Sequence, residues 1–250
     1  MPVTTPDRLP DDELRVLHWN IHSWQDEHGT SNVDAVAAVI QETDPHVVSL
    51  VEVDEAWGSP SRLGAVAGRC GYASIFVPVF EYGQEQPTGG FGNALLTKVP
   101  ISAVRQRQLV WPSTVYDGTE PSELRAVVFA KLGPLWVGST HLPRSSDEAR
   151  TEALERLKTV TSELDGDWLL CGDFNAPASS WIDSDDALRT VAPDPALATY
   201  PTEEPVELID YFVASSNVSL DAKVLDVRGS DHLAVLAVAR VSRDISRGFV

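Results

Sequence analysis

Short runs of apolar residues, some continuous and some alternating with polar ones, recur along the chain and predict β-strands. Residues 14–22 (LRVLHWNIH) alternate as a strand does when only one of its faces is buried. Residues 46–54 (HVVSLVEVD) are rich in the β-branched side chains that strands favour. Further strands are expected over residues 72–79, 91–98, 123–132, 135–142, 167–172, 206–215, 219–229 and 232–241.

Three other stretches are predicted to be helical. Residues 32–43 place their apolar side chains on one stripe, and Asn32 stands where it can cap the first turn. A shorter helix is expected over residues 60–69, and the longest over residues 145–164, which begin with the S-x-x-E pattern of a capping box at Ser145. Helices between the early strands, with hairpins in the middle and at the end, predict an α/β domain with mixed sheets.

The chain shows no internal repeat, low-complexity tract or break in composition that would divide it. Its 250 residues suffice for one large domain with a sizeable core. We therefore expect a flexible, polar lead-in over residues 1–13 and a single domain over residues 14–250. The first residues lack the apolar segment of a signal peptide, and no run is long enough to span a membrane, so a cytoplasmic location is expected.

The charge balance bears on the kind of partner that the protein can bind. The chain has 19 lysines and arginines against 37 aspartates and glutamates, a formal net charge of −18. Binding to nucleic acid is driven by basic side chains that displace counterions from phosphates, and only residues 104–108 (VRQRQ) place two such side chains close together. The composition therefore favours a solvated acidic surface and disfavours a nuclease that grips long DNA.

Polar side chains gather at or just beyond the ends of the predicted strands, where open α/β folds build their sites. An isolated Asn or Asp at such a position is usually a turn residue that hydrogen-bonds its own backbone. Glu52 and Asp210 are different, because each lies within a strongly apolar run where an unpaired charge costs several kcal/mol. The full set is Asn20, His22, Glu52, Asn93, Arg125, His141, Asp173, Asn175, Asp210, Asp231 and His232.

The residue types in this set suit one kind of chemistry. Carboxylate and amide oxygens without thiolates are the ligands of a hard cation, Mg²⁺ or Mn²⁺. Histidines and an arginine can neutralise a phosphate, and the remaining acceptors can orient a water molecule. Together they are the components of metal-assisted attack on a phosphoester.

Seven segments also resemble, in order, those of the endonuclease/exonuclease/phosphatase superfamily of deoxyribonuclease-like metal-dependent phosphohydrolases. They are WNIH (19–22), VSLVEVD (48–54), GFGNALLTK (90–98), STHL (139–142), CGDFNAP (171–177), LIDYFVAS (208–215) and GSDHLAV (229–235). The resemblance spans residues 14–242 and implies a four-layered α/β sandwich, in which two packed mixed β-sheets are flanked by helices. Its members include pancreatic deoxyribonuclease, apurinic endonucleases, sphingomyelinases and inositol-phosphate phosphatases.

The resemblance implies roles for the matching residues. Asn20 and Glu52 correspond to a metal-binding pair, and Asp231 to a carboxylate near the metal, which would be Mg²⁺ or Mn²⁺. Asp173 corresponds to the residue that orients or deprotonates the attacking water, and Asn175 to the one that holds the phosphate or the nucleophile.

The same resemblance assigns His232 to the transition state. This histidine would stabilise charge on the phosphoryl oxygens and would be oriented by Asp210. His141, which is also expected to be catalytic, and Arg125 correspond to phosphate contacts, and Arg125, Asn93 and His22 are the expected substrate-binding residues.

Three functions are consistent with these residues. The favoured one is a metal-dependent phosphoesterase acting on a small-molecule, lipid-headgroup or nucleotide substrate, because the acidic surface disfavours long DNA. A Mg²⁺-dependent DNA endonuclease or exonuclease is the first alternative, and a non-catalytic binding protein on the same fold is the second.

Overall fold

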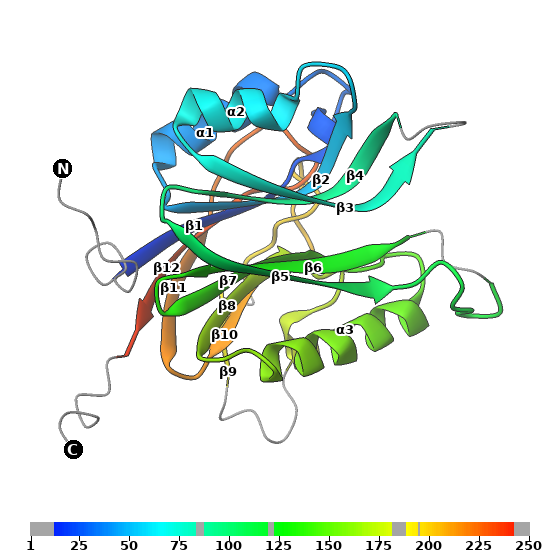
Figure 1. Cartoon of the computed structure of the whole chain (residues 1–250), viewed down its shortest axis with the longest axis vertical. Coiled ribbons are helices and arrows are strands. Elements are labelled where there is room, and N and C mark those ends of the chain that lie inside the picture. The colour runs from blue at the N-terminus through cyan, green and yellow to red at the C-terminus, as the bar shows by residue number, and fades with distance from the viewer. Residues whose placement is uncertain (1–12, 84–87, 120–122, 182–188, 195, 243–250) are drawn as a thin grey trace.

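Two β-sheets packed face to face form the centre of the structure, a computed structural model that describes residues 13–83, 88–119, 123–181, 189–194 and 196–242. Helices α1 (Val33–Thr43) and α2 (Arg62–Cys70) cover the outer face of one sheet, and α3 (Asp147–Ser162) covers the outer face of the other (Figure 1). This arrangement confirms the expected α/β sandwich. Within the described residues, no helix is long and apolar enough to cross a membrane.

The first sheet has six strands in the order β11-β12-β1-β2-β4-β3. They are β1 (Glu13–Asn20), β2 (Val47–Ala56), β3 (Ala73–Tyr82), β4 (Gly89–Thr97), β11 (Val218–Val224) and β12 (Val235–Val241). β1 and β2 are parallel and are connected through α1, as a parallel pair requires, whereas the other neighbouring strands are antiparallel. Of the predicted lead-in over residues 1–13, only Glu13 lies within the described residues, and it begins β1.

The second sheet has six strands in the order β5-β6-β7-β8-β10-β9. They are β5 (Ile101–Val110), β6 (Arg125–Leu132), β7 (Leu135–His141), β8 (Asp167–Asp173), β9 (Arg189–Ala192) and β10 (Asp210–Ser215). Its one parallel pair, β7 and β8, is connected through α3. Each sheet is therefore mixed, as the sequence predicts.

The sequence does not predict two of these strands, β5 and β9. Both lie at an edge of the second sheet. Much of β5 is exposed, and its centre is the polar run Arg105–Gln108. Edge strands commonly carry charged side chains and are held by one neighbour, so neither has the apolar pattern that marks a strand in the interior of a sheet.

The starts of two helices differ from the prediction. Asn32 occupies the N-cap position of α1, but its side chain makes no capping bond and donates instead to the carbonyl oxygens of Ile21 and Gln25, at 2.9 Å each. Helix α3 is capped by Ser146 rather than Ser145, through a backbone N–H that donates to the Ser146 hydroxyl at 3.1 Å. The side chain of Asn32 therefore stabilises the loop after β1 and does not cap α1.

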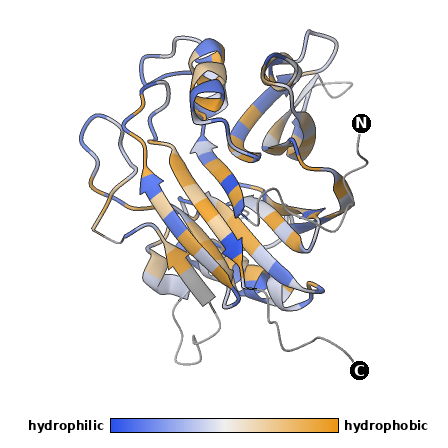
Figure 2. Ribbon diagram, turned by 90° about the vertical axis from the view of Figure 1, so that its left-hand side faces the viewer, coloured by the Kyte–Doolittle hydropathy of each residue, from blue (hydrophilic) through white to orange (hydrophobic). Residues whose placement is uncertain are grey.

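Successive side chains of each strand point alternately into the space between the sheets and outward to the helices. In β1, Leu14 and Val16 belong to the core between the sheets, whereas Leu17 and Trp19 pack with α1 and α2. Figure 2 shows hydrophobic and hydrophilic bands alternating along the strands. The same alternation buries Cys171 of β8 between the sheets.

At one end of the sandwich the inward-facing positions change from apolar to polar. After Val16, β1 continues with His18 and Asn20, and after Cys171, β8 continues with Asp173. The buried polar residues at such inward positions are His18, Asn20, Ser49, Asn93, Ser139, His141, Asp173 and Asp210. The polar end of the layer between the sheets is therefore the candidate site.

β7 and β8 lie in close contact at this polar end of the layer between the sheets. Gly172 pairs with Thr140 across the parallel ladder. A Cβ at residue 172 would lie 2.3 Å from the carbonyl oxygen of Thr140 and 2.8 Å from its Cγ2 atom. The residue before Asp173 must therefore be glycine for the two strands to pair as they do.

We expect Gly172→Ala to lower the free energy of unfolding by about 1–3 kcal/mol, because the added methyl group forces β8 away from β7. Gly68→Ala in α2 is the control, since a Cβ there meets nothing within 4 Å, and it is expected to be neutral or to stabilise by up to about 1 kcal/mol. Chemical denaturation measures both variants. Equal effects of the two substitutions would contradict this description of the strand contact.

Candidate active site

Asp173, at the end of β8, is the centre of the site. Its side chain is 2% exposed, and its Oδ2 atom lies 3.1 Å from Nδ2 of Asn20, which donates to it. Nε2 of His141 lies 3.5 Å and Nε2 of His232 lies 3.7 Å from the same oxygen. The backbone N–H of Asn175 donates to Oδ1 at 3.0 Å. One buried carboxylate thus contacts four of the residues that the sequence singles out.

His232 is held by a second buried carboxylate, that of Asp210. Nδ1 of His232 lies 2.8 Å from Oδ2 of Asp210, and the hydroxyl of Thr199 donates to that oxygen at 2.7 Å. The indole N–H of Trp19 donates to the backbone carbonyl of His232 at 2.8 Å, and the ring of Tyr200 lies 4.7 Å from the imidazole. The imidazole is therefore fixed from several sides, with Nε2 directed at Asp173.

Three buried residues that the sequence analysis did not single out extend from Asp210. Nε2 of His18 lies 3.3 Å from Oδ1 of Asp210, and Nδ1 of His18 lies 3.0 Å from the hydroxyl of Ser49. That hydroxyl lies 2.7 Å from the hydroxyl of Ser139. A polar histidine within an apolar strand is the same signal that identified Glu52 and Asp210, so His18 could have been found from the sequence.

The buried charges at the centre shift one another's pKa values. Burial raises the pKa of Asp173 to about 7, and the negative charge of Asp210 adds to this rise. Burial opposes a charge on His232, yet Asp210 and Asp173 raise the pKa of this histidine to about 10. Burial also opposes ionisation of Asp210, but His232 and His18 bring its pKa below the ordinary value. At neutral pH, Asp210 and His232 are therefore an ion pair, and Asp173 is close to the midpoint of its titration.

His141 differs from His232 in charge, and the cationic Arg125 contributes to this difference. Burial, together with the positive charge of Arg125, keeps the pKa of His141 well below its ordinary value, so this histidine is neutral at pH 7. Arg125 is 7% exposed, and its guanidinium lies 3.5 Å from the carboxylate of Glu123. Its Nε atom is buried and has no hydrogen-bond partner among the described residues. A buried guanidinium with a free donor is suited to an anionic ligand.

Glu52 reaches the site because β2 is irregular where it passes. The pairing of β2 with β4 shifts register between Leu50 and Val53, and Glu52 has a φ of 57°. A β-bulge of this kind redirects a side chain that the regular alternation would place elsewhere. Oε1 of Glu52 thereby accepts a hydrogen bond from Nδ2 of Asn20 at 3.1 Å.

The amide of Asn20 lies between two carboxylates, those of Glu52 and Asp173, and donates to both. The oxygen of the same amide accepts from the backbone N–H of His22 at 3.1 Å. Carboxylate and amide oxygens are the ligands that suit a hard cation such as Mg²⁺ or Mn²⁺. Asp231 lies at the rim, where its Oδ1 atom accepts from the hydroxyl of Ser230, which also contacts the backbone oxygen of Asn20 at 2.7 Å. Glu52 and Asn20, with Asp231 at the rim, remain the candidate residues for holding a metal, and the carboxylate of Asp173 lies next to them.

Two groups of carboxylates and histidines among the described residues bring their ligand atoms within 4.8 Å of one another. In the buried group, Asp173, Asp210 and His232, the carboxylate of Asp210 is already paired with His232 at 2.8 Å. The other group, Glu27, His28 and Glu203, borders a cleft of about 340 Å³ that Asp231 also lines. This cleft therefore lies next to Asp231, at the rim of the candidate site.

The turn after β8 positions Asn175. Its φ is 48°, and its Nδ2 atom donates to the backbone oxygen of Leu142 at 2.9 Å and lies 3.3 Å from Nε2 of His141. The preceding Phe174 is fully buried, and its ring stacks on that of Tyr211 at 4.2 Å. This packing holds the turn, and within it the backbone N–H of Asn175 donates to the side chain of Asp173, the last residue of β8.

Asn93 and His22 lie farther from the centre. Nδ2 of Asn93 donates to the backbone oxygen of Ala126 at 2.9 Å and so ties β4 to β6 across the sheets. β1 ends at Asn20 rather than at His22, which begins a short 3₁₀ segment (His22–Trp24) whose residues have positive φ. Nδ1 of His22 lies 3.7 Å from Oδ1 of Asp231, at the rim of the site.

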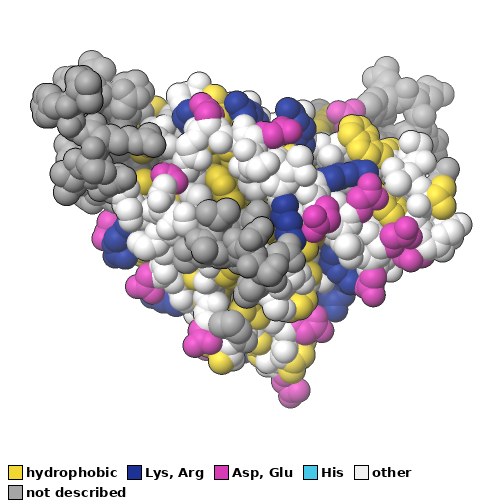
Figure 3. Space-filling model, turned by 90° about the horizontal axis from the view of Figure 1, so that it is seen from below, with side chains coloured by type: hydrophobic (Ala, Val, Ile, Leu, Met, Phe, Trp, Pro, Cys, Tyr) yellow, Lys and Arg dark blue, Asp and Glu magenta, His cyan; other side chains and the backbone are white. Residues whose placement is uncertain are grey.

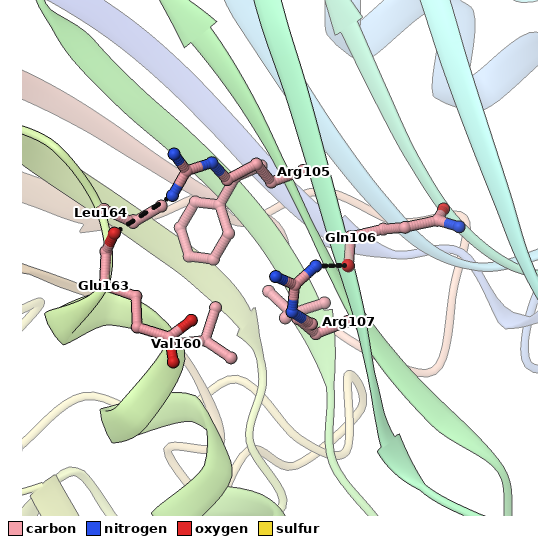
Figure 4. Close-up of a pocket in the computed structure, with 8 residues that line it drawn as sticks. Arg105, Gln106, Arg107, Val160, Glu163 and Leu164 are labelled. Carbon is pink, nitrogen blue, oxygen red and sulfur yellow. Dashed lines mark hydrogen bonds between the residues drawn. The ribbon is translucent and has the colours of Figure 1, made fainter.

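A smaller pocket lies elsewhere, between β5 and the end of α3. Its volume is about 10 Å³, and Arg105, Arg107, Glu163 and Leu164 help to line it (Figure 4). Arg105 donates to the backbone oxygen of Glu163 at 3.1 Å. This pocket holds at most about one water molecule and lies on the outer side of the second sheet, so it is separate from the site.

The fold is thus a two-sheet α/β sandwich whose inner layer becomes polar at one end. The sequence matches the model of the Endonuclease/Exonuclease/phosphatase family over residues 17–232, a range that includes every candidate site residue. The chain therefore belongs to this family, whose members are phosphoester hydrolases that generally use a divalent metal. No curated protein sequence matches the chain.

Solved structures share the fold. One is an endonuclease/exonuclease/phosphatase from Beutenbergia cavernae (TM-score 0.69, 22% identity, covering 92% of this chain and 72% of that chain). Another is a mannosyl-6-phosphatase from Bacteroides thetaiotaomicron (TM-score 0.69, 15% identity, 90% and 99%). A third is the catalytic domain of human Nocturnin with bound sulfate anion (TM-score 0.66, 18% identity, 92% and 94%). At these identities the similarity establishes the shared fold.

We expect Asp173→Asn to stabilise the metal-free protein, increasingly so as the pH rises. The pKa of Asp173 is raised from 3.8 to about 7, so between these values the folded protein holds a proton that the unfolded chain has lost. Stability is therefore lost as the pH rises from 3.8 towards 7, and an uncharged asparagine avoids this loss. Thermal unfolding with a chelator, at about pH 5 and about pH 8, measures the difference.

Asp221→Asn is the control for this experiment, because it removes one negative charge from an exposed position on β11. Its stability relative to the unmodified protein should change little between the two pH values. An Asp173→Asn variant no more stable than the unmodified protein at the higher pH would contradict the electrostatics described here.

Proposed function

We propose that the protein is a metal-dependent phosphoesterase that hydrolyses a small-molecule, lipid-headgroup or nucleotide substrate by attack of water on phosphorus. One observation carries the proposal: Asp173, with a pKa near 7, is buried among Asn20, Asn175, His141 and the cationic His232. A base, donors that orient it and a fixed cation thus meet within hydrogen-bonding or ion-pair distance.

Asp173 is the general base in this proposal. A group with a pKa close to the working pH combines a useful ionised fraction with enough basicity to accept a proton. Asn20 donates to Oδ2 and the Asn175 backbone to Oδ1, so the carboxylate is held in one plane. Water bound against it would lose its proton to Asp173 as it attacks.

His232 and Arg125 stabilise the charge that develops on the phosphoryl oxygens. Asp210 keeps His232 protonated and fixes its tautomer, since Nδ1 is committed to the carboxylate at 2.8 Å and Nε2 remains for the substrate. The free Nε donor of Arg125 adds a second charged contact. Fixed donors in a buried site stabilise such charge more than water does, because they need no reorganisation.

A bound Mg²⁺ or Mn²⁺, held by Glu52 and Asn20 with Asp231 nearby, would supply positive charge that polarises a phosphoryl oxygen. The chain's own contribution is to keep Glu52 at the bulge of β2 and Asn20 at the end of β1. Both are therefore placed by backbone structure instead of by flexible loops.

Charge supports a small substrate over long DNA. The net charge is −18, and basic side chains are interspersed with acidic ones over the described part of the face shown in Figure 3. The cleft beside Asp231 is lined by three glutamates, Glu27, Glu203 and Glu204. The negative net charge and the acidic lining of this cleft repel a polyanion. The likeness to a mannosyl-6-phosphatase fits a small phosphoester.

We expect Asp173→Ala and His232→Ala each to lower kcat by about 10²- to 10⁴-fold, with KM far less affected, because each removes a group that acts in the transition state. A panel of phosphomonoesters and phosphodiesters, assayed with Mg²⁺, Mn²⁺ and a chelator, measures the change. Asp221→Asn is the matched control and should retain activity. Near-normal turnover in either alanine variant, or activity that survives the chelator, would contradict the proposal.

A nicking assay on supercoiled plasmid over a salt series separates the substrate classes. The proposal predicts that plasmid is cleaved slowly compared with the best small phosphoester, and without a steep fall as salt rises, because few basic side chains are available to displace counterions. Faster cleavage of plasmid would instead support a DNA nuclease. No hydrolysis of any substrate, together with no thermal stabilisation by either metal, would support a non-catalytic binding protein.

A further inference from the structure

A line of buried hydrogen-bonding side chains leads from the candidate site across the space between the sheets. It runs from Asp210 of β10 to His18 of β1, then to Ser49 of β2 and Ser139 of β7. All four residues are 0% exposed. The line therefore joins two strands of each sheet through side chains alone.

This line lies at the border of the apolar core. The inward residue two positions away from each member, on the side away from the site, is apolar and belongs to the core between the sheets: Val16, Val47, Val137 and Phe212. Apolar side chains at 18, 49 and 139 would extend that core, because buried polar groups cost free energy unless they are hydrogen-bonded. Packing alone therefore gives no reason for polar side chains at these three positions.

The hydrogen bonds around Asp210 are divided between its two oxygens. Oδ2 faces His232 and Thr199, while Oδ1 faces His18 at 3.3 Å. Without the contact to Oδ1, rotation of the carboxylate is opposed from one side only. With it, both oxygens are held, and Oδ2 stays in line with Nδ1 of His232.

The two serines fix the imidazole of His18 in turn. A serine hydroxyl can donate one hydrogen bond and also accept. Ser49 can therefore hydrogen-bond Nδ1 of His18 and the hydroxyl of Ser139 at the same time. His18 and Ser49 are also register partners in the parallel pair of β1 and β2. The backbone thus sets the distance between them.

We propose that His18 is a positioning residue, which holds Oδ1 of Asp210 so that Oδ2 keeps His232 directed at the phosphoryl group. This role rests on the proposed function. His18 touches neither the substrate nor the attacking water, and it acts only through Asp210 and His232. Ser49 and Ser139 keep the His18 ring in the orientation that this contact needs.

The test compares His18→Leu, which removes the donor but fills the core, with His18→Gln, whose amide N–H reaches towards the place of Nε2. We expect His18→Leu to lower kcat about 10- to 100-fold, as loss of a residue that orients a catalytic group does, with KM unchanged. His18→Gln should recover most of kcat. Val16→Ala, on the same face of β1, is the control: it weakens packing, and kcat should stay normal in the folded protein.

A second readout does not depend on activity. In protein labelled with ¹⁵N at histidine, two-bond ¹H–¹⁵N correlation spectra report the protonation of each ring nitrogen. We expect the Nδ1 resonance of His232 to move in His18→Leu and to stay in place in His18→Gln and Val16→Ala. If no phosphoester is hydrolysed even by the unmodified protein, the proposed function fails, and this spectrum still decides the role of His18.

Two results would overturn the role of His18. One is a His18→Leu variant with an unchanged His232 resonance, whether or not kcat falls. The other is a His18→Gln variant as impaired as His18→Leu in both readouts, because the hydrogen-bond donor would then be irrelevant.

Discussion

The layer between the two sheets is the constraint on which the rest of the structure depends. Every second side chain of a strand enters this layer, and over most of its extent these side chains are apolar and fully buried. Where the same positions become polar, the side chains remain enclosed by the two sheets and must satisfy one another. The site is therefore built from strand positions whose direction is already fixed by the alternation that builds the core.

Burial between the two sheets also explains the protonation states of the candidate site residues. In a buried place of low dielectric, a carboxylate stays ionised only beside a cation, and Asp210 has one in His232. Asp173 is left with less compensation, so its pKa rises to about 7. One carboxylate thus keeps a histidine charged, and the other becomes a base that can gain and lose a proton near neutral pH. Two chemically identical groups differ because their neighbours differ.

Much of the fold follows from the sequence, because strong alternation and β-branched runs mark interior strands such as β1 and β2. Edge strands cannot be predicted from such patterns. The central residues of β5 are polar, and the strand is held by its pairing with β6. Part of the candidate site can also be expected from the sequence, since Glu52 and Asp210 stand in apolar runs where a charge needs a partner. The residues that contact Glu52 and Asp210 are harder to predict from the sequence. His18 meets Asp210 across 192 positions of sequence, and the bulge that directs Glu52 has no signature in β2 alone.

The central claim is that the polar end of the layer between the sheets binds a metal ion and a phosphoryl group side by side. A crystal structure of the protein with Mn²⁺ and inorganic phosphate tests this claim most directly, because anomalous scattering locates the metal. The expected result is a Mn²⁺ peak at Glu52 and Asn20, with phosphate oxygens on His232 and Arg125. A Mn²⁺ peak at Glu27, His28 and Glu203, or phosphate bound away from His232, would contradict the claim.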